Sequence, residues 1–238
     1  MSQVRISYDV PTSVMDINSL GFLRIVEAVK KFCPDAKIYQ AGSSEMFGKV
    51  YEIPQTEKTP FRPQSPYGVS KVAAFFMARV YREAYGMNIY NGILFNHESF
   101  RRGDNFLSKK VVKAAVRIKK GLQDRLVLGN LDARRDWGWS KEYVNWIWNI
   151  MQGEPNDFVI CTGETNSVKD FVRATFDMLD MDFEDYVDYD QDLERPAEVD
   201  ILKGDYTKSK EILGFTPQVR FLDLVKIMVD EELASYES

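Results

Sequence analysis

The spacing of apolar and polar positions predicts alternating helices and strands along the first hundred residues. Apolar side chains recur at helical spacing in residues 19–32 and again in residues 67–85, so each segment is predicted to be a helix. Residues 36–41 and the apolar and aromatic run of residues 88–96 are each predicted to be a strand. This helix–strand–helix–strand order favours an α/β fold with a parallel sheet and crossover helices.

The second helix has signals at both of its ends. Ser65 and Pro66 have the order of an N-cap followed by a first-turn proline. Gly86 is suited to close the helix, because glycine adopts a left-handed backbone conformation without strain. We therefore expect the helix to start directly after Ser65 and to end at Gly86.

The apolar pattern is weaker after about residue 100, although helices are still predicted. They cover residues 109–120, 141–151 and 168–179, and a last helix begins near Phe221. A strand is predicted at residues 158–162. The strongly acidic segment of residues 177–194 is interpreted as a solvated connection, because a cation site would need a tighter ligand spacing.

Composition narrows the classes of function. The 238 residues suffice for one large domain or two small ones, and the formal charge of −5, with no basic stripe, argues against a nucleic-acid-binding protein. No apolar run approaches the ~20 residues that span a bilayer, and the first ten residues do not have the pattern of a secretory signal. We expect no membrane partner and a cytoplasmic location.

Cysteine and histidine are scarce. Cys33 and Cys161 lie far apart in the chain, which favours two unpaired thiols in a reducing compartment, although a disulfide between them stays open at this point. With His97 as the single histidine, these residues cannot make a zinc site by themselves, so no metal site is expected.

Tyr67 and Lys71 lie four residues apart at the start of a predicted helix, so both side chains share one face. A nearby ammonium favours the phenolate, which could act as a base near neutral pH. Tyr206 and Lys210 have the same spacing, so the pair alone is weak evidence. Ser43, at the end of the preceding predicted strand, adds a hydroxyl where α/β folds place ligands. A Ser–Tyr–Lys site and a surface coincidence both remain open.

Glu45 lies between a predicted strand end and the bulky apolar residues Met46 and Phe47. These neighbours are expected to desolvate the carboxylate, which suits a group that exchanges protons. The alternative is an exposed loop carboxylate.

Five sequence segments, taken together, are typical of one protein family: SSEMFGK at 43–49, SPYGVSK at 65–71, ILFNHESFRRGDNF at 93–106, GNLDARRDWG at 129–138 and RPAEVDILKGD at 195–205. Together they resemble the GDP-mannose 4,6-dehydratase family of extended short-chain dehydrogenases, and the likeness runs through nearly the whole chain. Tyr-x-x-x-Lys is shared by the whole superfamily, whereas the later three segments in this order are specific to this family.

The resemblance implies roles for four residues. In that family NADP takes hydride from C4 of mannose, a glutamate removes the C5 proton and helps water leave from C6, and hydride returns to C6. Tyr67 would be the base for the C4 hydroxyl, Lys71 its electrostatic support and Glu45 the acid/base for elimination. Ser43 occupies a position where the family usually has threonine, which keeps the hydroxyl.

The resemblance also implies a binding site for GDP-mannose. Asn96 would contact the sugar diphosphate and Glu198 would accept hydrogen bonds from hydroxyls, while positive charge would come from Lys110, Arg135 and Arg195. Arginine suits this because its planar fork matches phosphate oxygens.

The resemblance also implies that Tyr67, Lys71, His97 and Arg102 contact the cofactor NADP. In the family, the loop that holds Arg101 and Arg102 reaches a neighbouring subunit's cofactor, which implies a homo-oligomer, a tetramer.

The expected fold is α/β, a partial doubly wound, Rossmann-like parallel sheet with a smaller C-terminal substrate-binding region. Residues 1–100 would carry the catalytic residues, and residues 101–238 mainly the nucleotide-sugar-binding region with some sheet-completing elements. No Gly-x-Gly occurs in the sequence, and dinucleotide binding in this fold uses such a turn. By the resemblance, the first four strands are absent.

Four interpretations therefore stay open. The chain could be a GDP-mannose 4,6-dehydratase polypeptide lacking its cofactor-binding half, a non-catalytic remnant that binds GDP-sugar or oligomerises, one half of a split enzyme whose other chain supplies the missing part, or a related dehydratase acting on another nucleotide sugar.

Overall fold

A three-stranded parallel sheet lies at the centre of the molecule. The structure, a computed structural model, describes residues 1–194 and 197–236. The sheet consists of β1 (Ile38–Ala41), β2 (Ile89–Leu94) and β7 (Asp157–Ile160) in the order β1-β2-β7, all parallel. Within the described residues, β2 is thus the central strand, and all six of its residues are buried. This confirms the α/β class and the parallel sheet.

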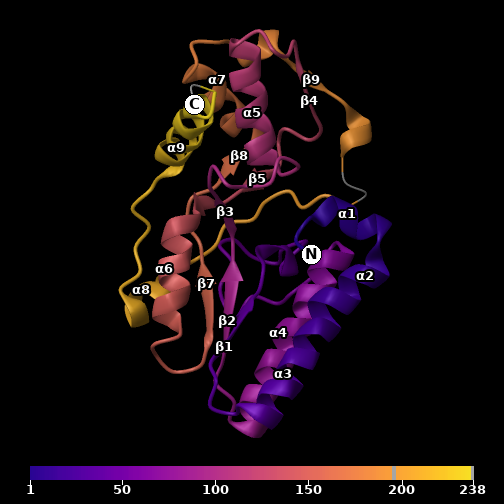
Figure 1. The fold of residues 1–238 in the computed structure, drawn as a ribbon, viewed down its shortest axis with the longest axis vertical. Helices are drawn as coiled ribbons and strands as arrows, with labels where there is room; N and C mark the ends of the chain where they lie inside the picture. Colours follow the sequence, from indigo (N-terminus) through magenta and orange to yellow (C-terminus); the bar gives the residue numbers. More distant parts are fainter. Residues whose placement is uncertain (195–196, 237–238) are drawn as a thin grey trace.

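Helices cover both faces of this sheet (Figure 1). On one face lie α3 (Gly21–Phe32) and α4 (Pro66–Tyr85), and on the other lie α6 (Ser140–Ile150) and α8 (Thr207–Leu213). The period of two along a strand explains this arrangement. Ile89 packs in the cluster with Phe22, Val26, Ala74 and Ala78, whereas the next residue, Tyr90, packs in the cluster with Tyr143, Trp146, Ile150 and Phe215.

The signals at the ends of α4 are confirmed. The Ser65 side chain accepts a hydrogen bond from the backbone N–H of Gly68, and Pro66 is the first helical residue. Gly86 ends the helix with a φ of 64°. A buried polar network then ties α4 to the sheet: Asp157 accepts hydrogen bonds from Arg82 at 2.9 Å and from Asn91 at 2.8 Å.

The N-terminal residues form more helix than predicted. Two short helices, α1 (Val4–Asp9) and α2 (Pro11–Met15), and a π-helical turn, η1 (Asp16–Leu20), lead directly into α3. The apolar spacing predicts only the part from residue 19 onward. The earlier part buries mainly polar groups, such as Asn18 against Ser70, so it lacks the apolar period.

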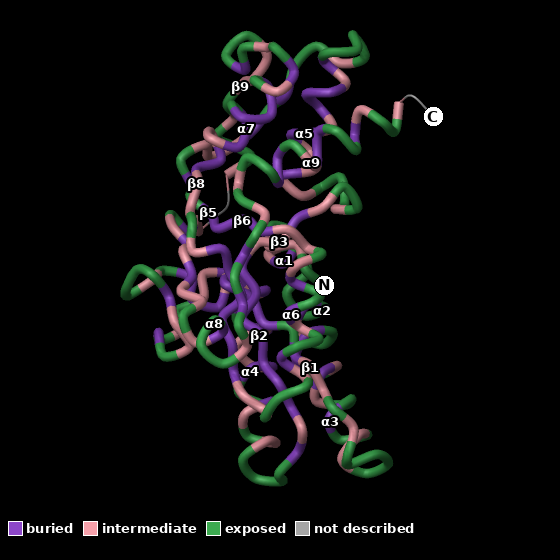
Figure 2. Tube along the Cα trace, turned by 90° about the vertical axis from the view of Figure 1, so that its left-hand side faces the viewer, coloured by how far each residue is buried: buried purple, intermediate pink, exposed green. Residues whose placement is uncertain are grey.

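A second core lies away from the sheet, at the top of Figure 1. It is built by α5 (Leu107–Lys119), α7 (Val168–Asp177) and α9 (Phe221–Ala234), beside a parallel pair of β4 (Leu126–Leu128) and β9 (Val187–Tyr189). Its fully buried side chains include Val111, Ala115, Phe171, Phe176, Leu224 and Val225. Figure 2 shows buried residues in both regions of the molecule.

Short strand pairs connect the two regions. β3 (Asn96–Glu98) pairs in parallel with β6 (Trp137–Trp139), and β5 (Arg134–Arg135) pairs antiparallel with β8 (Asn166–Ser167). The division of the chain at residue 100 stays a prediction, but α6, β7 and α8, which lie beyond it, complete the layers around the central sheet.

The acidic segment of residues 177–194 is mostly exposed or half-buried, as a solvated connection would be, but it also contains regular structure. The segment contains two 3-10 turns, η3 (Phe183–Asp185) and η4 (Gln191–Leu193), with strand β9 between them. Phe183 is buried in the second core, and Arg125 pairs with Asp188 of β9. These features were missed because only Leu179 and Phe183 of this segment are buried, so the sequence shows no apolar period.

Both cysteines are free in the structure, as expected: Cys33 is exposed and Cys161 is buried. In the parts of the chain that the structure covers, no helix has the length and apolar character to cross a bilayer. Residues 1–194 and 197–236 also contain no group of His, Cys, Asp or Glu side chains arranged to hold a metal ion.

Candidate active site

A cavity of about 560 Å³ opens at the carboxyl ends of β1 and β2. It is lined by residues that follow each strand, including Ser43, Glu45, Asn96 and His97, and by Tyr67, Lys71, Arg102 and Lys110 from other segments. Eight of the eleven residues singled out in the sequence therefore meet in one cavity. Its position is the one where parallel α/β sheets bind ligands.

Glu45 and Tyr67 are brought together by a close approach of two backbones. Glu45 belongs to η2 (Ser44–Met46), a turn capped by the Ser43 side chain, which accepts from the Glu45 N–H at 3.3 Å. Gly68 packs against this turn, and a Cβ at Gly68 would lie 2.8 Å from the carbonyl oxygen of Glu45. The glycine next to Tyr67 thus lets the first turn of α4 contact the loop after β1.

Tyr67 is buried, and its hydroxyl is hydrogen-bonded to Ser43. Burial raises the pKa of Tyr67 above its ordinary value, and the charge of Glu45 raises it further, while the bond to Ser43 and the charge of Arg102 lower it. The expected phenolate is therefore not favoured in the chain without ligands. The physical reason is that desolvation of the phenol outweighs the positive charges around it.

Lys71 lies beside Tyr67 as predicted. Its Nζ is 5.7 Å from the centre of the Tyr67 ring and donates a hydrogen bond to the carbonyl oxygen of Ala41 at 2.9 Å. Burial lowers the pKa of Lys71. An ammonium has three donors, and the bond to Ala41 uses one of them, at the wall of the cavity.

Glu45 is less desolvated than the sequence suggested. Met46 and Phe47 are fully buried, but Glu45 is only half-buried and lines the cavity. The two apolar neighbours anchor the turn in the core and leave the carboxylate facing the site. Its charge acts on the phenol of Tyr67.

His97 is held in one orientation by two contacts. Its Nδ1 lies 2.9 Å from the carbonyl oxygen of Phe95, and its ring stacks on Tyr143 with the centres 5.1 Å apart. Because the carbonyl oxygen of Phe95 can only accept a hydrogen bond, Nδ1 must carry the proton. In the neutral ring, Nε2 is then an acceptor. Burial lowers the pKa of His97, so the ring is neutral at pH 7.

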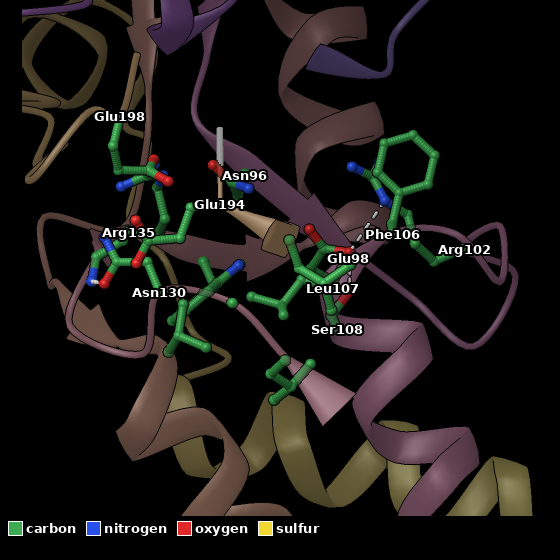
Figure 3. A pocket seen from close by; sticks show the side chains of 16 residues that line it. Asn96, Glu98, Arg102, Phe106, Leu107, Ser108, Asn130, Arg135, Glu194 and Glu198 are labelled. Carbon is green, nitrogen blue, oxygen red and sulfur yellow. Dashed lines mark hydrogen bonds and ion pairs between the residues drawn. The ribbon is translucent and has the colours of Figure 1, made fainter. Parts of the chain in front are cut away.

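A smaller cavity of about 190 Å³ adjoins the first and shares Asn96 and Arg102 with it (Figure 3). Arg135 and Glu198 line this smaller cavity. Arg135 is 5% exposed and donates to the carbonyl oxygen of Val199 at 2.7 Å and to Glu198 at 3.1 Å. The guanidinium is thus fixed by the protein before any ligand binds.

The remaining two predicted residues are Lys110 and Arg195. Lys110 lines the larger cavity and donates to the carbonyl oxygen of Val127 at 2.7 Å, and burial lowers its pKa. Arg195 lies outside the described residues.

Comparison with known proteins decides the family. A family model described as GDP-mannose 4,6 dehydratase matches residues 1–228. GDP-mannose 4,6 dehydratase 2 of Arabidopsis thaliana is 51% identical over 237 residues, which cover 98% of this chain and 63% of that protein. The chain belongs to the GDP-mannose 4,6-dehydratase family. The human GDP-mannose 4,6 dehydratase is 42% identical over 252 residues, covering 98% of this chain and 68% of that protein. The chain thus spans about two thirds of the length of these relatives.

Solved structures share the fold of this GDP-mannose 4,6-dehydratase family member. RMD from Pseudomonas aeruginosa complexed with NADPH superposes with a TM-score of 0.90 at 22% identity, covering 99% of this chain and 79% of that one. DesIV, a dTDP-glucose 4,6-dehydratase from Streptomyces venezuelae, superposes with a TM-score of 0.88 at 20% identity, covering 99% and 72%. These likenesses confirm the Rossmann-like architecture.

Two buried carboxylates of this dehydratase family member were not predicted: Glu98, which lines the smaller cavity, and Asp136, which follows Arg135 in the sequence. Glu98 accepts a hydrogen bond from Ser108 and pairs with Arg102. Asp136 accepts hydrogen bonds from the backbone and hydroxyl of Thr162. Both stand next to predicted residues, inside the segments NHES and RDWG. Neither segment carries a local signal that its acidic residue is buried.

Proposed function

We propose that this chain provides the catalytic and substrate-binding part of a GDP-mannose 4,6-dehydratase, which forms GDP-4-keto-6-deoxy-mannose. One observation carries the proposal: Ser43, Glu45, Tyr67 and Lys71 line a single cavity at the carboxyl ends of two parallel strands. Membership of the family, shown by the 51% identity to the Arabidopsis protein, supports the choice of substrate.

Tyr67 is the base for the C4 hydroxyl of the mannose ring. Ser43, already hydrogen-bonded to Tyr67, helps to orient the phenol, and the positive charges of Arg102 and Lys71 stabilise the phenolate as the proton moves. Because burial raises the pKa of Tyr67 in the chain without ligands, proton removal depends on these neighbours.

Glu45 is the general acid/base for the elimination of water. Once C4 is a ketone, the C5 proton is acidic, and the Glu45 carboxylate accepts it. The C5–H and C6–O bonds break, a C5–C6 double bond forms, and Glu45 returns the proton to the departing hydroxyl, which leaves as water. The half-buried position of Glu45 on the cavity wall suits a group that must reach both C5 and C6.

A nicotinamide cofactor, NADP by family resemblance, would accept the C4 hydride and return it to C6. The donor set of the larger cavity fits such a group: the Lys71 ammonium has donors beyond its bond to Ala41, and His97 presents Nε2 as an acceptor. RMD and DesIV carry NADPH and NAD in their structures. The sequence has no Gly-x-Gly for the pyrophosphate.

The smaller cavity and its shared wall bind the GDP moiety in this proposal. Asn96, Lys110 and Arg135 contact the diphosphate, and Glu198 accepts hydrogen bonds from ligand hydroxyls, with Arg195 adding positive charge. Arg135 is pre-organised by its bonds to Val199 and Glu198, which lowers the entropy cost of binding. A homo-oligomer and a cytoplasmic location belong to the same proposal.

Deuterium incorporation tests the proposal. The chain, alone and mixed with the cofactor-binding part of the Arabidopsis relative, is incubated with GDP-mannose and NADP in deuterated water. We expect deuterium at C5 of the product formed by the mixture, because the chain alone has no Gly-x-Gly turn for the cofactor. Tyr67→Phe should abolish both oxidation and exchange, whereas Glu45→Gln should still allow C4 oxidation but slow product formation by roughly 10²–10⁴-fold.

Tyr206→Phe is the matched control, because Tyr206 and Lys210 have the spacing of the proposed pair but do not line the cavity. It should keep full activity. A mixture that makes no product, or a Glu45→Gln variant as fast as wild type, would contradict the proposed function.

A further inference from the structure

Glu98 is a buried carboxylate for which the proposed reaction has no use. It ends β3, paired in register with Trp139 of β6, and is 2% exposed. Burial of a carboxylate is costly unless it is paired and hydrogen-bonded. Glu98 lines the smaller cavity and therefore stands at the site, not in the distant core.

Two elements hold the Glu98 side chain. The Ser108 hydroxyl, from the first turn of α5, donates to Oε2 at 2.5 Å. The Nε of Arg102 lies 3.2 Å from the same oxygen and forms an ion pair, drawn as a dashed line in Figure 3. The serine thus fixes the carboxylate, and the carboxylate then faces the arginine.

The opposite contact on Arg102 is aromatic. Its guanidinium carbon lies 3.7 Å from the centre of the Phe106 ring, within the range of a cation–π contact. The ring covers one face of the guanidinium, while Glu98 takes the Nε edge, so neither contact uses the terminal Nη donors. Arg102 lines both cavities, and its charge acts on Tyr67 and His97.

We propose that Glu98, held by Ser108, is a positioning residue that fixes the Arg102 guanidinium in the wall between the two cavities for the phosphate oxygens of a bound nucleotide. Arginine presents its Nη donors to phosphate as a planar fork, and such recognition depends on orientation. The inference rests on the proposed function for the identity of the ligand, but the contact between Glu98 and Arg102 can be tested without one.

Nucleotide binding is measured by calorimetry with GDP and, separately, with NADP, the latter in the mixture with the cofactor-binding part of the Arabidopsis relative. Glu98→Gln keeps the size of the side chain and removes its charge. Because a mobile arginine must be ordered on binding, we expect the variant to bind roughly two- to tenfold more weakly. Arg102→Ala should bind roughly 10- to 100-fold more weakly, and the double variant should be no weaker than Arg102→Ala. Weakening confined to GDP assigns Arg102 to the substrate, and weakening confined to NADP assigns it to the cofactor.

A second readout needs no nucleotide. Phenylglyoxal modifies arginine side chains, and mass spectrometry gives the rate at Arg102 by itself. We expect Glu98→Gln to raise this rate severalfold, because the Nε edge loses its anionic partner. Glu232→Gln is the matched control: Glu232 is also a buried carboxylate, paired with Lys109, the residue next to Ser108, but it does not line either cavity. It should leave both readouts unchanged.

The outcomes separate the two claims. Wild type that binds neither GDP nor NADP overturns the proposed function. An unchanged phenylglyoxal rate at Arg102 in Glu98→Gln, or equal changes in Glu232→Gln, overturns the positioning inference alone. Should Glu98→Gln fail to fold, Ser108→Ala removes only the hydroxyl donor, and unchanged nucleotide affinity with an unchanged Arg102 rate would again refute the inference.

Discussion

Asp136→Asn should destabilise the chain by an amount that depends on pH. The Asp136 carboxylate accepts hydrogen bonds through Oδ1 from the Thr162 N–H at 2.8 Å and the Thr162 hydroxyl at 2.7 Å, and through Oδ2 from the Gly163 N–H at 2.9 Å. An asparagine keeps the Oδ1 contacts, but its NH₂ group cannot accept from Gly163. The lost partner of this backbone N–H costs roughly 1–3 kcal/mol.

The dependence on pH follows from the burial of Asp136. Desolvation raises its pKa from the ordinary 3.8 to about 7, although the hydrogen bonds oppose the shift. Between these values the native state holds a proton that the unfolded state has released. The contribution of Asp136 to the free energy of unfolding is therefore fully present below pH 3.8 and is lost as the pH rises to about 7. This contribution falls by at most ~1.4 kcal/mol per pH unit. Asparagine does not titrate, so the wild type's advantage should shrink from pH 5 to 7.

Urea unfolding at pH 5, 6, 7 and 8 gives the difference in unfolding free energy between wild type and Asp136→Asn at each pH. The comparison requires that this free energy fall with urea concentration at the same slope in both proteins. Asp132→Asn, in the same segment but exposed, serves as the control and should show no such trend. A difference that stays constant or grows with pH would refute the reasoning. It would mean that the donors from Thr162 and Gly163 hold Asp136 ionised in spite of its burial.

Three further predictions concern the candidate site. His97, the single histidine, should titrate by NMR with a midpoint below 6.5, because burial lowers its pKa; a midpoint at or above 6.5 would contradict this. The 238-residue chain alone should not bind NADP with micromolar affinity, because it has no Gly-x-Gly turn; a calorimetric dissociation constant of around a micromolar (about −8 kcal/mol) would overturn the prediction. Arg195→Ala should weaken GDP binding by roughly 1–3 kcal/mol, and unchanged affinity in a folded variant would remove Arg195 from the site.

Much of the central fold could be predicted because its signals are local. The continuous apolar run gave β2, and Ser65 and Gly86 marked the ends of α4 where the structure has them. The short strands could not be found in this way. β5 and β8 have two residues each, and their pairing joins positions more than thirty residues apart, such as Arg134 and Ser167. Such pairs depend on tertiary contacts and leave no period in the sequence.

At the candidate site, too, some residues could be found from the sequence, whereas others depend on tertiary contacts. The spacing of Tyr67 and Lys71 on one helix face left a surface coincidence open, and the family resemblance implied their roles. The structure brings both residues together with Ser43 and Glu45 in one cavity. Glu98 and Asp136 could not be predicted, because burial of each carboxylate depends on partners elsewhere: Ser108 for Glu98 and Thr162, 26 residues further on, for Asp136. The desolvation of Tyr67 was missed for a related reason, since it arises from the packing around α4.

The wall shared by the two cavities couples their occupants. Asn96, Arg102 and Phe106 are among the residues that line both cavities. A ligand that contacts these side chains from one cavity therefore changes the surface that a ligand in the other cavity contacts. Thermodynamic reciprocity then requires that the factor by which one ligand alters the affinity for the second equal the factor in the opposite direction. Cooperativity between two ligands on one chain would thus be carried by the side chains of this wall, with no movement of a domain.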